Sequence, residues 1–145
     1  MASTRDTITF TVSLPPPSIR RNSETKKHAY RAKLIREYQE TVWCAGYEVW
    51  SRSVPAQHRS TPERLRWHPW PKAHVHYVWK SIQQTDEDNI IANCKPILDV
   101  IKSTGNRPLG IIGDDKHAQV TCEWQKAAHK ADECVEIIIE RMEEK

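Results

Sequence analysis

The hydrophobic period changes along the chain, and this change constrains the fold more than any other feature. Residues 7–14 alternate apolar and hydroxyl side chains, as a half-buried strand does. Residues 29–50 then carry apolar side chains three and four positions apart, which is the spacing of an amphipathic helix. A chain of 145 residues that mixes both periods is predicted to form a single small α+β domain.

Later segments continue this mixture of periods. Residues 74–79 and 118–124 alternate again and predict two further strands. Residues 87–104 have a helical stripe, and Pro96 inside it predicts a kink or break. Residues 134–142 fit either a strand or a helix, and their β-branched residues favour a fourth strand.

Prolines and glycines set the predicted boundaries. Pro15, Pro16 and Pro17 end the first strand, because proline cannot donate to a ladder. Gly46 predicts an early end to the first helix. The expected architecture is thus a roughly four-stranded mixed or antiparallel sheet with two main helices over residues 1–145. Residues 51–72, rich in proline and arginine, are predicted to form an irregular insertion.

Composition excludes several classes of protein. No apolar run approaches the roughly 20 residues that a membrane helix needs, and the first ten residues lack a secretory pattern. The four cysteines show no C-x-x-C pair, which disfavours a zinc ribbon and predicts reduced thiols in a cytoplasmic protein. Residues 1–80 carry 14 lysines and arginines against 6 acidic residues, whereas residues 81–145 carry 8 against 13. A basic half suits a polyanion, and an acidic half suits a hard cation.

Five aspartates stand out in the acidic half. Asp86 and Asp88 lie between a predicted strand and the following helix, Asp99 lies on that helix, and Asp114 and Asp115 precede the next strand. Mg²⁺ prefers oxygen ligands and needs few carboxylates, so a cluster of these side chains is a candidate metal site. On a continuous helix, Asp88 and Asp99 would share one face with Lys95 between them.

Other interpretations of these residues remain open. Aspartates before a helix are also typical N-caps, and a paired aspartate after glycine is also typical of a turn. Lys95 and Asp99 also fit a surface ion pair four residues apart on a helix. His74 and His76 share one face of a predicted strand, where they either bind zinc or face solvent.

The order of these motifs resembles the RusA family of Holliday-junction resolvases. The shared pattern is D-x-D-N at residues 86–89, a lysine with an aspartate four residues later at Lys95 and Asp99, and the D-D pair of residues 114–115 before a strand. The opening TFTVSLPPPS also resembles the family's first strand and proline turn. In the best-known members the lysine stands four residues after the second aspartate, where this chain has Ala92.

The resemblance implies a metal-dependent endodeoxyribonuclease, often encoded by phages or prophages, with a RusA-like fold. Asp86, Asp88 and Asp115 would bind Mg²⁺ or Mn²⁺ and form the catalytic centre together with Lys95, which would contact the scissile phosphate. Supporting roles fall to two further aspartates, Asp99 and Asp114.

The resemblance also implies partners. A four-way junction has near two-fold symmetry, so symmetric paired nicks call for a homodimer. Basic residues would contact the DNA backbone, namely Arg20, Arg21, Lys26 and Lys27, with Arg59, Arg64 and Arg66 as further candidates. Two alternatives remain: a non-catalytic relative that binds branched DNA, and an unrelated cytosolic α+β protein whose acidic residues are caps and turns.

Overall fold

The alternating segments pair into one mixed sheet in the computed structural model, which describes residues 7–20, 28–53, 70, 72–102, 109–112 and 118–142. Within these residues the sheet has four strands in the order β1-β4-β2-β3. The antiparallel neighbours of β4 are β1 and β2, whereas β3 runs parallel to β2. The strand bounds are β1 (Thr7–Val12), β2 (Ala73–Ser81), β3 (Ala118–Lys126) and β4 (Cys134–Arg141). The predicted α+β class and mixed sheet are therefore confirmed.

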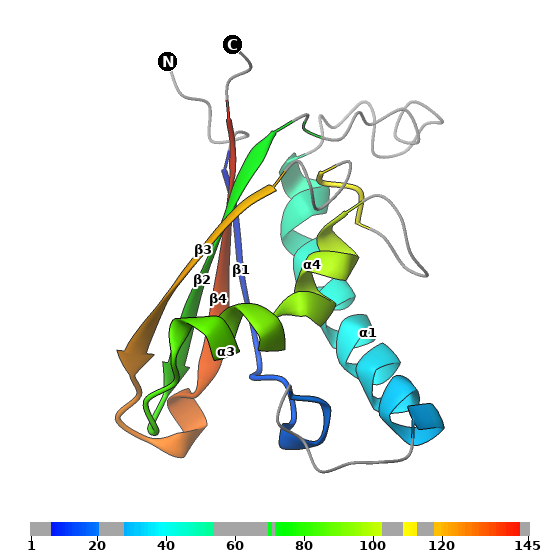
Figure 1. The fold of residues 1–145 in the computed structure, drawn as a ribbon. Coiled ribbons are helices and arrows are strands. Elements are labelled where there is room, and N and C mark those ends of the chain that lie inside the picture. Colours follow the sequence, from blue (N-terminus) through cyan, green and yellow to red (C-terminus); the bar gives the residue numbers. More distant parts are fainter. Residues whose placement is uncertain are drawn as a thin grey trace.

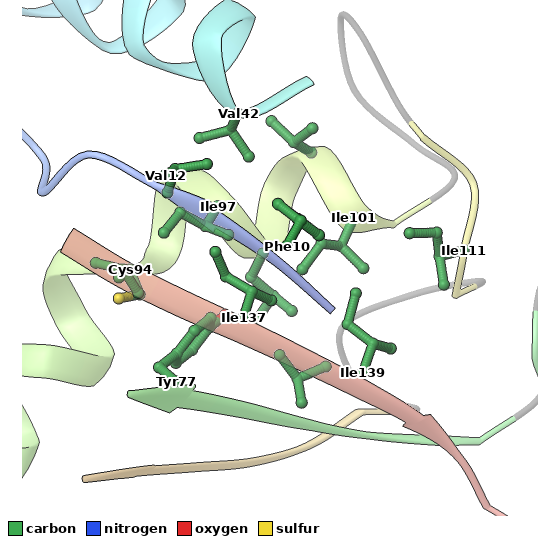
Figure 2. Packing of buried hydrophobic residues seen from close by; sticks show 14 of the residues in the cluster. Phe10, Val12, Val42, Tyr77, Cys94, Ile97, Ile101, Ile111, Ile137 and Ile139 are labelled. Carbon is green, nitrogen blue, oxygen red and sulfur yellow. The ribbon is translucent and has the colours of Figure 1, made fainter. Parts of the chain in front are cut away.

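Alternation in the strands separates a helix-covered face of the sheet from an open one. In β1 the apolar residues Ile8, Phe10 and Val12 are buried, and the threonines between them are exposed. Tyr77 of β2 and Ile137 of β4 are also buried and pack into the same cluster (Figure 2). The core thus lies on one face of the sheet, and the opposite face carries the polar side chains.

The described α-helices cover this apolar face. They are α1 (His28–Ser53), α3 (Glu87–Asn93) and α4 (Lys95–Ile101), and all three lie on the same side of the sheet (Figure 1). Two short 3₁₀ turns, η2 (Pro17–Ile19) and η5 (Lys130–Asp132), lie near one end of the sheet. Among the described residues, no helix combines the length and apolar character needed to span a bilayer.

The expectation that Gly46 ends the first helix is wrong. Helix α1 continues through Gly46 to Ser53. A Cβ at position 46 would lie 2.6 Å from Cδ1 of Leu109 and 3.2 Å from Cζ of Phe10. The glycine therefore allows the helix to approach the core closely, and tertiary packing outweighs the low helix propensity of glycine.

The break predicted near Pro96 is confirmed. Helix α3 ends at Asn93 and α4 begins at Lys95, while Cys94 between them has φ −90° and ψ 2°. Pro96 lies in the first turn of α4, where its missing N–H leaves no hydrogen bond unmade. The predicted apolar stripe survives the break, because Ile90, Cys94, Ile97 and Ile101 are all fully buried.

The ambiguous C-terminal segment forms β4, as the β-branched residues favoured. This strand lies between β1 and β2, so it is central in the sheet. Several predicted features lie outside the described residues: Arg21, Lys26, Lys27, Asp114, Asp115 and most of the insertion at 51–72.

Candidate active site

Asp86 and Asp88 lie where the chain passes from β2 into α3. The backbone of Asp86 takes the N-cap position, with φ −69° and ψ 150°, and its carbonyl oxygen accepts from Ile90 N at 3.0 Å. Its carboxylate makes no capping hydrogen bond, and the side chains of Asp86 and Asp88 are both exposed. The interpretation of the Asp86 side chain as a cap is therefore not supported, and two neighbouring carboxylates face solvent.

The acidic residues at the start of α3 lie close to Cys122 of the adjacent strand β3. Cys122 Sγ donates to the carbonyl oxygen of Glu87 at 3.5 Å. Partial burial raises the pKa of the Cys122 thiol, and the nearby carboxylates of Glu87 and Asp88 raise it further. These acidic side chains therefore produce a negative potential at the helix start, which favours a cation.

Lys95 lies at the start of α4 and pairs with Asp99. Its Nζ is 3.3 Å from Asp99 Oδ1, and the same oxygen lies 3.1 Å from Lys102 Nζ. The Lys95 side chain is 51% exposed, whereas that of Lys102 is 17% exposed. The surface ion pair that the spacing of Lys95 and Asp99 allowed is thus present, and a second lysine shares the carboxylate.

The predicted line of Asp88, Lys95 and Asp99 required one continuous helix. Because the helix breaks at Cys94, Asp88 belongs to α3 and the other two residues belong to α4. The structure brings Lys95 together with Asp99, and it places Asp88 near the β3 thiol of Cys122. Within the described residues, no three His, Cys, Asp or Glu side chains converge as a metal site.

A pocket of about 460 Å³ reaches the segment that leads from β2 into α3. It is bounded by the proline turn after β1, by the end of β2 and by Thr85, which directly precedes Asp86. Two cationic side chains, Arg20 and Lys130, and one carboxylate, Glu133, line it. The pocket therefore carries more positive than negative side chains and extends to the residue before Asp86, while neither Asp86 nor Asp88 lines it.

Packing holds Arg20 in this pocket. Its Nε donates to Pro15 O at 2.8 Å, and its guanidinium carbon lies 5.5 Å from the ring centroid of Trp79. Burial lowers the pKa of the Arg20 guanidinium, although the negative charge of Glu133 opposes this shift. These two contacts thus hold the Arg20 guanidinium in place without a ligand.

Sequence reasoning singled out Arg20 but missed the rest of this pocket. Trp79, Lys130 and Glu133 come from segments far from the proline turn in sequence, and the pairing of β4 with both β1 and β2 brings them together. The sequence signal was limited to the proline turn and its following arginine. Neither a known protein-family model nor a curated protein sequence matches the chain.

Proposed function

We propose that this chain is a metal-dependent endodeoxyribonuclease that cuts Holliday junctions and related branched DNA with paired nicks. The observation that carries the proposal is the pair of exposed carboxylates, Asp86 and Asp88, at the start of α3, directly after Thr85, which borders a pocket with two cationic side chains. The motif order shared with the RusA family supports the reaction and the substrate.

The chemistry of the donors fits Mg²⁺ or Mn²⁺. Mg²⁺ is usually bound through one or two carboxylates and keeps several waters, and Asp86 and Asp88 supply two exposed carboxylates. Asp115 is proposed as a third ligand, and Asp114 supports the site. When bound, the ion would activate a water molecule and stabilise negative charge on the phosphodiester.

Lys95 is proposed to bind the phosphate that is cut. An exposed lysine–carboxylate pair contributes little stability, so the Lys95 ammonium can leave Asp99 at small cost. Lys102 remains on the same oxygen of Asp99 and keeps that carboxylate compensated. Lys95 is proposed to exchange Asp99 for a phosphate that approaches α4.

Arg20 and Lys130 are proposed to bind the DNA backbone in the pocket that Thr85 borders. The anchored guanidinium of Arg20 presents a fixed positive charge, which suits a phosphate oxygen. Arg21, Lys26 and Lys27 extend this proposal along the basic segment that follows. Such contacts make binding strongly dependent on salt.

Paired nicks in a two-fold symmetric junction require two active sites, so we propose that the protein acts as a homodimer in the cytoplasm. Light scattering of the purified protein, alone and with a junction, measures this state directly.

The deciding experiment compares a labelled four-way junction with the matching linear duplex in Mg²⁺, in Mn²⁺ and in EDTA. We expect nicks on the junction alone, only with metal, and none with Asp88→Asn. Glu37→Gln removes an exposed carboxylate on α1, far from the site in sequence, and serves as the matched control. If the unmodified protein binds the junction tightly but does not cut it, a non-catalytic relative that binds branched DNA is favoured. If it neither binds nor cuts the junction, the aspartates are structural.

A further inference from the structure

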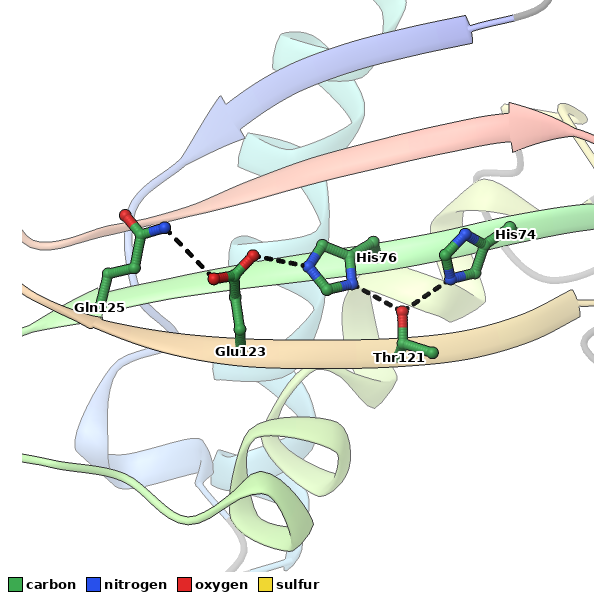
Figure 3. Close-up of polar contacts among 5 residues, drawn as sticks. All are labelled: His74, His76, Thr121, Glu123 and Gln125. Carbon is green, nitrogen blue, oxygen red and sulfur yellow. Dashed lines mark hydrogen bonds and ion pairs between the residues drawn. The ribbon is translucent and has the colours of Figure 1, made fainter.

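The open face of the sheet carries a continuous chain of polar contacts that the proposed nuclease does not use. Five side chains from β2 and β3 take part, and they project from the face opposite the helices (Figure 3): His74, His76, Thr121, Glu123 and Gln125. The parallel register aligns His76 with Thr121, so the histidines of one strand meet the hydroxyl and carboxylate of the next.

Both imidazoles converge on a single oxygen. His74 Nε2 and His76 Nδ1 each lie 2.6 Å from Thr121 Oγ1. On its other side, His76 Nε2 lies 2.9 Å from Glu123 Oε1. Gln125 Nε2 donates to the second carboxylate oxygen of Glu123 at 3.3 Å and holds that group in place.

These contacts determine where the protons lie. At neutral pH the exposed side chain of Glu123 is a carboxylate, which only accepts hydrogen bonds. His76 Nε2 must then donate to Glu123, and in the neutral ring His76 Nδ1 carries a lone pair. The lone pair on His76 Nδ1 and the Nε2 atom of His74 therefore both point at Thr121 Oγ1.

We propose that His74 and His76 bind a divalent transition-metal ion of the zinc, nickel and copper class, with Glu123 as the outer carboxylate that orients His76. Metal-bound histidines usually donate their other ring N–H to a carboxylate, and His76 already does so without metal. Imidazole nitrogen suits these metals, whereas Mg²⁺ prefers oxygen.

The hydroxyl of Thr121 must withdraw for the metal to enter. An ion with metal–nitrogen bonds of about 2.0–2.1 Å to both rings would lie close to the position of Thr121 Oγ1, which is 2.6 Å from each nitrogen. We expect rotation of Thr121 about χ1 to move its hydroxyl aside. Water molecules then complete the coordination.

The surroundings permit entry and favour a cation. The side chain of His76 is 24% exposed and that of Glu123 is 49% exposed, so both can be reached from solvent. Glu140 of β4 pairs with His74 in the ladder and adds a second exposed carboxylate to this face. This site lies on the opposite side of the sheet from α3, so it is separate from Asp86 and Asp88.

Calorimetric titration of the full chain with NiCl₂, and separately with ZnCl₂, tests the proposal in buffer that holds excess Mg²⁺. We expect His74→Gln and His76→Gln each to lose one bound equivalent relative to the unmodified protein. His129→Gln is the matched control, because His129 is an exposed histidine outside this cluster, and it is expected to keep every equivalent. The titration does not depend on nuclease activity, so its result is independent of the proposed function.

Two further measurements separate a metal site from a surface hydrogen-bond chain. Glu123→Gln is expected to weaken Ni²⁺ binding about 10–100-fold, as loss of an outer carboxylate does. Nitrogen NMR of the unmodified protein is expected to show Zn²⁺ ligation at His76 Nδ1 and His74 Nε2, and it requires no variant to fold. Equal binding by His74→Gln, His76→Gln and the unmodified protein, or unchanged ring signals with Zn²⁺, would overturn the proposal.

Discussion

The thiol of Cys122 on β3 donates to the backbone carbonyl of Glu87 in the first turn of α3, at 3.5 Å. This contact fastens the start of the helix to the sheet and places a titratable sulfur beside the candidate metal ligands. Burial, Glu87 and Asp88 together raise the pKa of the thiol. Cys122 therefore reports on the charge state of the helix start.

Divalent cations are expected to accelerate alkylation of Cys122. A cation bound at Asp88 offsets the two negative charges, so the raised pKa of Cys122 falls and the reactive thiolate becomes more abundant. The measurement is the rate of iodoacetamide labelling of each cysteine by peptide mass spectrometry, with and without Mg²⁺.

Cys44 provides an internal standard, because it is exposed and lies on α1. Its labelling rate should not respond to Mg²⁺, and the response of Cys122 should disappear in Asp88→Asn. Buried Cys94, whose pKa is raised by burial, should remain unlabelled in the native protein. A Cys122 rate that ignores Mg²⁺ would count against metal binding at Asp88.

Lys95→Ala is expected to reduce junction cleavage about 10²-fold while leaving the fold intact. The reason is the loss of a positive charge that stabilises the phosphodiester as it is cut. Lys33→Ala removes an exposed lysine of α1 outside the site and is the matched control. It should leave cleavage within a few-fold of the unmodified protein and reduce stability by at most about 1 kcal/mol. Similar activities of the two variants would remove Lys95 from the mechanism.

Tyr77 and Tyr38 are predicted to respond oppositely to removal of the hydroxyl. The buried hydroxyl of Tyr77 has no hydrogen-bond partner in the part of the chain that the structure describes, whereas Tyr38 OH donates to Ser13 O at 2.7 Å. Burial raises the pKa of both phenols, so both are neutral donors at ordinary pH. Urea denaturation should show Tyr77→Phe to be neutral or about 1 kcal/mol more stable, and Tyr38→Phe about 1 kcal/mol less stable. A loss of stability in Tyr77→Phe would show that its hydroxyl is satisfied.

Local patterns in the sequence predicted the elements well. The alternation of Ile8, Phe10 and Val12 sufficed for β1, and the stripe from Ile90 to Ile101 identified the helix and its buried face. Pro96 located the break, because loss of a backbone donor is a local property. The strand order and the parallel pairing of β2 with β3 could not be predicted, because strand pairing depends on residues far apart in sequence.

The candidate site was predicted in part for the same reason. The spacing of Asp86 and Asp88 favours a shared position at the start of a helix, and the structure has both exposed there, Asp86 at the N-cap and Asp88 in the first turn of α3. Their relation to Lys95 depends on the helix break, whose angle no sequence spacing gives. The role of Asp115 stays a prediction. The contact between Thr121 and the two histidines arises from the register of β2 and β3, and alternation alone gave only their shared face.

Gly46→Ala is predicted to destabilise the protein, although alanine is the better helix former. The substitution gains up to about 1 kcal/mol of helix propensity. The added methyl would lie 2.6 Å from Leu109 Cδ1 and 3.2 Å from Phe10 Cζ, in a region where both neighbours are about 5% exposed. Overpacking of a core typically costs 1–3 kcal/mol, so a net loss of about 1 kcal/mol is expected in urea denaturation.

Leu109→Ala should cost less in the Gly46→Ala protein than in the unmodified one, because the shortened side chain gives room to the new methyl. Additive effects of the two substitutions would show that α1 shifts instead, and a more stable Gly46→Ala would show that Leu109 yields without cost.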